Sequence, residues 1–190
     1  MTTTYTNITL LDIGQDEAAD WLAENNYSGA VSPTLDDVTV VYDDVLREYA
    51  DEDEPLEELL RLASELSYEF GCAAWLIVVD DAETLVYSLY VDGELLDTYG
   101  SKSGETPDGG DAEILADTFG APKRAIKQVR AVLKREATDA LERHKSLLSE
   151  LNLPHLALGT SYESILDGEL PSAIEDVDEL IMVELDEDDE

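Results

Sequence analysis

The sequence predicts an α+β protein with a mainly antiparallel sheet and a C-terminal helical subdomain. Short apolar and β-branched runs alternate with two helical patterns over residues 5–79, and an Asp-Gly turn then joins two further strand-like runs at 84–99. From residue 111 onward the apolar residues recur at helical spacing instead. We therefore expect a sheet domain over 1–104, a helical extension packed on it over 105–171, and an acidic, disordered tail over 172–190 in which 180–185 is the one candidate for order.

The sheet domain begins with elements in the order strand, helix, strand, strand, helix, strand. The second helix is the clearest, because Pro55 suits a first helical position, Gly71 suits a left-handed cap, and leucines recur every three or four residues between them. The expected ranges, in chain order, are 5–11, 15–25, 29–32, 38–42, 55–70 and 73–79. This order is that of a ferredoxin-like split βαβ unit, to which the hairpin at 84–99 is added.

The hairpin is predicted around Asp92-Gly93, a pair that suits the two positive φ angles of a type I′ turn. A two-residue loop with regular strands sets the facing pairs Tyr90/Leu95, Leu89/Leu96, Ser88/Asp97, Tyr87/Thr98 and Val86/Tyr99. One face of the hairpin is then apolar and is expected to point into a core; it carries Leu85, Tyr87, Leu89, Val91 and Leu96.

The other face of the hairpin is ambiguous. It would place the polar pair Ser88/Asp97 between Tyr90 and Tyr99, and a polar centre inside an aromatic rim suits a binding surface. The helical segments after Asp111 also need a surface to cover, and this face is the nearest candidate. We expect an internal interface, with a binding surface as the alternative, and the exposure of Tyr90 and Tyr99 decides between them.

The charge of the chain is extreme, with 46 acidic against 11 basic residues in 190 and a formal net charge of -35. The acids run from Asp12 to Glu190 and are not confined to a tail, so carboxylates cover the whole surface. Adaptation to a very salty cytoplasm explains this pattern, because molar salt screens the repulsion while the carboxylates keep the protein hydrated. Mimicry of nucleic acid is the alternative, and it is disfavoured because eight of the eleven bases lie within residues 123–145.

These bases include a cationic stripe on a helix that Pro122 opens. Its members lie at i, i+4, i+7 and i+11 and are Lys123, Lys127, Arg130 and Lys134. In so acidic a chain, we expect the stripe to pair with acids of its own chain, such as those after Glu48, or with a second copy. An anionic partner is the alternative.

No catalytic, metal or cofactor site is predicted. Two histidines and the single Cys72 cannot make a closed zinc site, and the acidic runs lack the glycine of a calcium loop. His144 lies on a leucine-lined face of a helix expected over 139–151, where a buried, hydrogen-bonded histidine is commoner than a catalytic one. One cysteine allows no intramolecular disulfide, and neither an export signal nor a membrane-spanning run is visible, so the cytoplasm is the expected location.

Three segments carry a resemblance to a known group of proteins: YSLYVDGELLDTYGS at 87–101, GGDAEILADTF at 109–119 and RHKSLLSELNLPHLALGTSYESILDGELP at 143–171. Over roughly residues 27–171 the chain resembles a family of small uncharacterised soluble bacterial proteins that is common in cyanobacteria. The resemblance implies no activity and carries over no catalytic residue. The residues that match recurring positions of that family are Arg143, His144, Pro154, Gly159, Tyr162, Gly168 and Pro171.

The sequence thus favours a non-enzymatic protein with an adaptor or regulatory role in a high-salt cytoplasm. It would bind a protein partner, or associate with itself, through the Tyr90/Tyr99 face or the cationic stripe, with no direct binding of nucleic acid and no membrane contact. The alternative is a small-ligand-binding protein or a hydrolase-type enzyme that uses His144 with Arg143 beside it, or Ser88 with Asp97. A nucleic-acid mimic is the third hypothesis.

Overall fold

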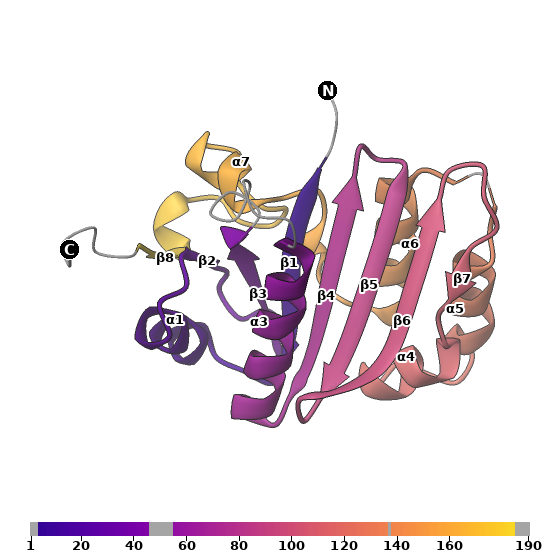
Figure 1. Cartoon of the computed structure of the whole chain (residues 1–190), viewed down its shortest axis with the longest axis horizontal. Helices are drawn as coiled ribbons and strands as arrows, with labels where there is room; N and C mark the ends of the chain where they lie inside the picture. Colours follow the sequence, from indigo (N-terminus) through magenta and orange to yellow (C-terminus); the bar gives the residue numbers. More distant parts are fainter. Residues whose placement is uncertain (1–3, 46–54, 137, 185–190) are drawn as a thin grey trace.

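The computed structural model describes residues 4–45, 55–136 and 138–184. In this part of the chain, an eight-stranded antiparallel sheet has the strand order β7-β6-β5-β4-β1-β3-β2-β8. Helices lie on both faces of the sheet, and the later helices form a C-terminal group on one of them (Figure 1). The predicted α+β class, with a mainly antiparallel sheet and a C-terminal helical part, is confirmed.

The elements of the described residues have the following bounds, in chain order. They are β1 Tyr5–Leu11, α1 Gln15–Glu24, β2 Gly29–Val31, β3 Val38–Asp43, α3 Pro55–Phe70, β4 Ala73–Asp80, β5 Thr84–Val91, β6 Glu94–Lys102, β7 Asp108–Gly109, α4 Ala112–Thr118, α5 Ala125–Leu133, α6 Ala140–Leu151, the 3-10 turn His155–Ala157, α7 Tyr162–Leu166, the 3-10 turn Val177–Glu179 and β8 Ile181–Val183. None of these helices has the length and apolar character that crossing a membrane requires.

Strand β1 lies at the centre of the sheet and pairs with both β3 and β4. Because side chains alternate along a strand, Ile8 and Leu10 point to one face while Tyr5 points to the other. Helices α1 and α3 cover the first face (Figure 1) and bury its apolar side chains together with leucines of their own. We call this side the α3 face.

Helices α4, α5 and α6 cover the opposite side of β4, β5 and β6, which we call the α6 face (Figure 1). Trp75 of β4 is fully buried there, with its ring centroid 5.2 Å from that of Phe119 and 5.6 Å from that of Tyr87. These aromatic contacts join the sheet to the segment that follows α4. The C-terminal helices therefore share one core with the sheet.

The β5–β6 hairpin differs from its predicted register. The Asp92-Gly93 turn has the two expected positive φ angles, and Tyr90 lies opposite Leu95 as predicted. The register then shifts between Leu89 and Tyr90, so that the next pairs are Leu89/Asp97, Ser88/Thr98, Tyr87/Tyr99 and Val86/Gly100. The predicted Ser88/Asp97 pair is wrong, and so is the prediction that Tyr90 and Tyr99 share a face.

The physical reason is a β-bulge, which adds one residue to β6 and reverses which side chains face the core beyond it. Leu96, predicted in the core, is 47% exposed, whereas Tyr99 is buried on the α6 face with its ring stacked on Tyr87 at 5.3 Å. The irregularity thus leaves Leu96 at the surface and places Tyr99 in the core beside Tyr87.

The segment from residue 172 to residue 184 is ordered, both within 180–185, the one stretch expected as a candidate for order, and before it, where disorder was predicted. Strand β8 pairs with β2, and Ile174, Leu180 and Val183 are buried. Gln15 at the start of α1 donates a hydrogen bond of 2.7 Å to the carbonyl of Glu179. Apolar residues between the acids therefore tie this segment to the sheet edge, while 185–190 lie outside the described residues.

Candidate functional site

His144, a candidate catalytic base, lies inside the core on the α6 face. Its side chain is fully buried, and its Nδ1 atom is 2.7 Å from the hydroxyl of Tyr5. Trp75 approaches edge-on, with 6.1 Å between the ring centroids. Burial lowers the pKa of His144 to about 3, so the imidazole is neutral near pH 7. A neutral histidine enclosed by aromatic rings packs the core, and it reaches no substrate in this conformation.

Arg143, the neighbour of His144, caps a helix. Its guanidinium is buried and its Nη1 atom donates to the carbonyls of Val132 at 2.6 Å and Leu133 at 3.3 Å, while Nη2 donates to the carbonyl of Arg135. These carbonyls close the C-terminal end of α5, which lacks intrahelical donors. The hydroxyl of Tyr99 donates to the Leu133 carbonyl at 2.8 Å. Arg143 therefore holds α5 against α6 and the sheet.

The four candidate residues of the hairpin do not form one site. Ser88 and Tyr90 are buried on the α3 face, and Tyr99 is buried on the α6 face. Asp97 accepts hydrogen bonds from the Tyr87 hydroxyl at 2.7 Å and from the backbone N–H of Asp111 at 2.9 Å. Its carboxylate thereby ties β6 to the start of α4. The alternative of an aromatic-rimmed binding surface at these residues is wrong, because the rim is divided between two faces.

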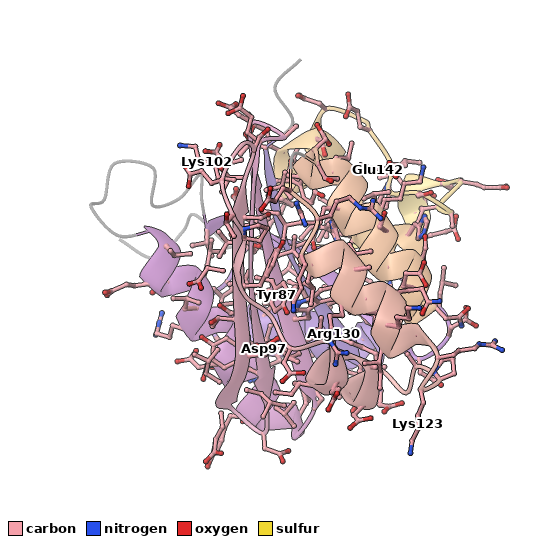
Figure 2. All side chains as sticks on the ribbon, turned by 90° about the vertical axis from the view of Figure 1, so that its right-hand side faces the viewer. Tyr87, Asp97, Lys102, Lys123, Arg130 and Glu142 are labelled. Atoms are coloured by element: carbon pink, nitrogen blue, oxygen red, sulfur yellow. The ribbon has the colours of Figure 1, made fainter. Side chains whose placement is uncertain are left out.

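The cationic stripe lies at the surface (Figure 2). Arg130 forms an ion pair with Glu113, with 2.9 Å between Nη2 and Oε1. Within residues 4–45, 55–136 and 138–184, no ion pair involves Lys123, Lys127 or Lys134. The expected pairing with acids of the same chain is thus found for one member of four, and the acids directly after Glu48 lie outside the described residues.

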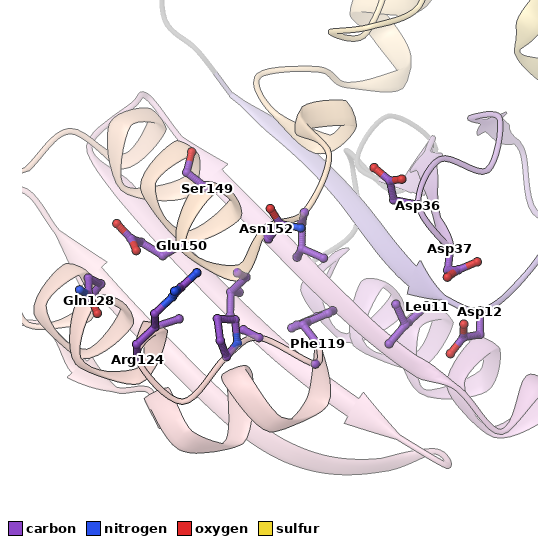
Figure 3. A pocket seen from close by; sticks show the side chains of 16 residues that line it. Leu11, Asp12, Asp36, Asp37, Phe119, Arg124, Gln128, Ser149, Glu150 and Asn152 are labelled. Atoms are coloured by element: carbon purple, nitrogen blue, oxygen red, sulfur yellow. The ribbon is translucent and has the colours of Figure 1, made fainter.

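A cleft of about 670 Å³ opens beside the first turn of α5 (Figure 3). Arg124, Gln128 and Glu150 stand on one side of it, and three aspartates stand on the other: Asp12, Asp36 and Asp37. Between the two sides lie apolar residues, with Leu11 and Phe119 among them. The cleft therefore has an apolar floor between a wall with a cation and a wall of carboxylates, which we call the arginine wall and the aspartate wall.

The sequence analysis missed this cleft. Its residues come from the end of β1, the β2–β3 turn, the α4–α5 connection and the end of α6, which are distant along the chain. The available signal was weak: Asp36-Asp37 marks a turn, and Arg124 stands just before a helix. Neither pattern indicates that the two segments meet in space.

A second, more apolar cleft of about 440 Å³ shares Leu11 and Asp12 with the first. Cys72 lies in its lining, and burial raises the pKa of this thiol to about 11. A thiol that stays protonated is a poor nucleophile. Across the described residues, no three His, Cys, Asp or Glu side chains are placed to hold a metal ion.

Replacing His144 with glutamine is expected to flatten the loss of stability in acid. The folded-state pKa of His144 lies below the unfolded value of about 6.5, so the unfolded chain takes up the proton first, and stability is lost as the pH falls from about 6.5 toward 3. At pH 4.5 this loss amounts to about 2–3 kcal/mol of unfolding free energy. Urea titrations of both proteins at pH 7.5 and 4.5 measure it, and parallel changes in the two proteins would contradict the neutral, buried histidine.

Comparison of the chain with protein-family models, with curated proteins and with solved structures finds no match. The resemblance to the bacterial family stays a prediction. The function therefore has to be argued from the placement and chemistry of these residues.

Proposed function

We propose that the protein is a non-enzymatic binding protein that recognises an acidic segment of another protein through the cationic stripe. The observation that carries this proposal is the exposure of Lys123, Lys127 and Lys134 without an ion pair in the described part of a chain that has 46 acids. Unpaired, aligned cations can be engaged by carboxylates of a partner, which makes α5 the best-supported docking surface.

The firm attachment of α5 supports this role. Val129, Val132 and Leu133 are buried on its inner side, and Arg143 caps its C-terminal end. Lys127 and Arg130 therefore lie on a helix with little freedom to move, with Lys134 at its C-terminal cap and Lys123 just before its first turn. Binding a partner there costs little ordering of the backbone. Such a preformed surface suits an adaptor or regulatory role.

The charge of the whole molecule favours a short acidic protein segment over nucleic acid. A long polyanion that contacted the stripe would also approach the remaining surface of a chain with a net charge of -35. A short acidic segment can contact the positively charged stripe without approaching the negatively charged surface around it. A second copy is less suitable, because it brings a further net charge of -35 to the contact, and this repulsion opposes association.

Two finer structural proposals accompany this function. The strand order β4-β1-β3-β2, with α1 and α3 on one face, supports a ferredoxin-like split βαβ unit extended by the β5–β6 hairpin. This fold hosts many functions and carries no argument for any one of them. We also attribute the acidic surface to life in a high-salt cytoplasm rather than to nucleic-acid mimicry, because the cations are gathered on one helix and its surroundings.

The enzyme alternative has little support in the geometry. His144 is enclosed in the core, Arg143 is engaged with backbone carbonyls, and Ser88 and Asp97 lie in different surroundings. A small-ligand function is favoured by one observation, the cleft beside α5.

Reversing two charges of the stripe is expected to weaken binding of an acidic probe. The variant Lys127→Glu/Lys134→Glu should bind a short oligoglutamate peptide about tenfold more weakly than the unaltered protein, because each exposed ion pair contributes up to about 1 kcal/mol. The matched control Lys102→Glu/Lys145→Glu makes the same change of net charge at exposed residues outside the stripe. Fluorescence anisotropy at the lowest salt at which the chain is folded measures both affinities.

The control variant should bind the peptide within about twofold of the unaltered protein. Equal weakening in both variants would attribute binding to net charge alone and contradict the proposal. Tighter binding of single-stranded oligothymidylate than of oligoglutamate would contradict the choice of a protein partner. Sedimentation of the unaltered protein alone tests self-association, and a dimer lost only in Lys127→Glu/Lys134→Glu would replace the acidic partner with a second copy.

A further inference from the structure

The cleft beside α5 keeps opposite charges apart. Arg124 is exposed and forms no ion pair with any described residue, although the chain has four acids for every base. Asp12, Asp36 and Asp37 are exposed on the aspartate wall, and no ion pair among the described residues involves them. Figure 3 shows the two walls separated by Phe119 and Leu11. The charges of the cleft thus do not neutralise each other.

The floor of the cleft is anchored in the core. Phe119 packs against the fully buried Trp75, and Leu151 and Leu153 are buried at the end of α6. The apolar lining that a ligand body can reach comes mainly from Leu11, Ala121 and Pro122, and a volume of about 670 Å³ is in the range of small-molecule sites. The ligand body that fits this part of the cleft is apolar.

The backbone conformation determines where the charged side chains of the two walls lie. Asp12, Asp36 and Asp37 all have positive φ angles of 48° to 63°, and the backbone N–H of Asp12 donates to the carbonyl of Asp37 at 2.8 Å. This bond joins the end of β1 to the β2–β3 turn and brings the three carboxylates to one side. Arg124 directly precedes α5, whose first turn is held by the buried Ala125.

We propose that this cleft binds a small zwitterion whose ammonium and carboxylate groups are separated by an apolar body, the chemistry of a short apolar peptide with free ends. The ammonium group pairs with the aspartate wall, the carboxylate pairs with Arg124, and the apolar side chains lie on the floor around Phe119. A purely cationic ligand leaves Arg124 unused, and a purely anionic ligand leaves three carboxylates facing it. A zwitterion complements both walls.

Glu150 modulates this site. It is half-buried and stands on the same side of the cleft as Arg124 (Figure 3), where its carboxylate opposes the carboxylate of the ligand. Glu150→Gln is therefore expected to strengthen zwitterion binding about two- to fivefold, as removal of a like-charge contact at a partly exposed site should.

Trileucine and its two singly charged analogues test the proposal. Isothermal titration calorimetry of the full chain, at a salt concentration at which circular dichroism shows it folded, should detect binding of trileucine. N-Acetyl-trileucine, which lacks the ammonium group, and trileucine amide, which lacks the carboxylate, should each bind at least about fivefold more weakly, because charge-assisted hydrogen bonds contribute roughly 1.5–3 kcal/mol.

Two variants test the contribution of each wall to binding independently. Arg124→Gln should weaken trileucine about fivefold and leave trileucine amide unchanged, since the amide has no carboxylate to lose. Asp36→Asn/Asp37→Asn, which keeps residues that tolerate positive φ, should weaken trileucine and leave N-acetyl-trileucine unchanged. The control Arg135→Gln removes an exposed arginine beyond the far end of α5 and should change nothing.

These crossed effects cannot arise from a general loss of folding, which would weaken every ligand together. No binding of trileucine overturns the proposal, and so does equal binding of trileucine and trileucine amide, which would make the cleft a site for cations only. Loss of binding in Arg135→Gln to the same extent as in Arg124→Gln would also overturn it. The stripe variant Lys127→Glu/Lys134→Glu should retain trileucine binding. Failure of the zwitterion proposal can therefore be distinguished from failure of the proposed binding of an acidic protein segment.

Discussion

Lowering the salt concentration from molar to about 0.05 M is expected to unfold the protein at 25 °C. The Debye length is about 3 Å in 1 M salt and exceeds about 10 Å below 0.1 M, so carboxylates that are screened from each other in the first condition repel across the surface in the second. The formal net charge of -35 is distributed along the whole chain. Spread over the folded surface, this charge opposes the compact state and favours the expanded one.

The structure offers little internal compensation for this repulsion. Among the residues it describes, the side-chain ion pairs are those of Arg61 with Glu58 and Glu65, and of Arg130 with Glu113. Their basic partners are more than 45% exposed, where ion pairs contribute at most about 1 kcal/mol. The carboxylates therefore depend on ions of the solvent for screening.

Far-UV circular dichroism at decreasing sodium chloride concentrations measures this effect, and the ellipticity at 222 nm should fall to its unfolded value. Sucrose provides the control, because it stabilises folded proteins by exclusion from their surface but screens no charge. If sucrose rescues the fold at low salt as well as sodium chloride does, repulsion is not the cause. A melting temperature that stays constant across the salt range would refute the salt-adaptation hypothesis.

The order of the elements could be predicted because its signals are local. The helix Pro55–Phe70 begins at a proline and ends before Gly71, whose φ of 58° is the left-handed conformation expected of a helix cap. The apolar run 73–79 became the buried strand β4, next to the central strand. Each of these elements is determined by residues within its own segment.

The register of the hairpin could not be predicted in the same way. The turn at Asp92-Gly93 was correct, yet the bulge beyond it is stabilised by contacts outside the hairpin: Tyr99 bonds to the carbonyl of Leu133, and Asp97 bonds to the backbone of Asp111. A pattern of alternating residues contains no information about these partners. One extra residue then moved every side chain beyond it to the opposite face.

The cleft depends on still more distant relations. Arg124 is 87 to 112 residues from the three aspartates of the other wall, and only the packing of the C-terminal helices on the α6 face brings the two walls together. The cationic stripe was visible in the sequence because its spacing is local. That three of its members form no ion pair with any described residue depends on the fold. Sequence patterns therefore locate charges better than they locate the partners of those charges.

Replacing Arg143 with methionine is expected to lower the unfolding free energy by about 3 kcal/mol. The guanidinium is only 2% exposed and donates to the carbonyls of Val132, Leu133 and Arg135. Val132 and Leu133 each keep one other donor, the backbone N–H of Arg135 and the Tyr99 hydroxyl, so the cost is the loss of charge-assisted hydrogen bonds, which contribute about 1.5–3 kcal/mol each. Arg143→Lys keeps the charge but replaces the planar fork with a single ammonium, and should cost about 2 kcal/mol. Urea denaturation at high salt measures both variants.

A matched control is available on the same helix. Lys145→Met removes an exposed cation two residues further along α6 and should change stability by less than about 0.5 kcal/mol. The opposite outcome for Arg143 has a clear physical meaning: if Arg143→Met were as stable as the unaltered protein, the cost of burying the charge would equal the value of its hydrogen bonds. We expect the bonds to outweigh that cost, because the negative end of the α5 dipole faces the guanidinium.

The variant also connects stability to the proposed function. Arg143 touches neither the stripe nor the cleft, but it holds the C-terminal end of the helix that carries the stripe and forms the arginine wall of the cleft. Hydrogen exchange in folded Arg143→Met should therefore accelerate first at the amides of α5, and its affinity for oligoglutamate should fall even where the chain remains folded. An unchanged affinity would show that the stripe needs only its charges, whereas a loss would show that it needs them on a helix fixed against the sheet.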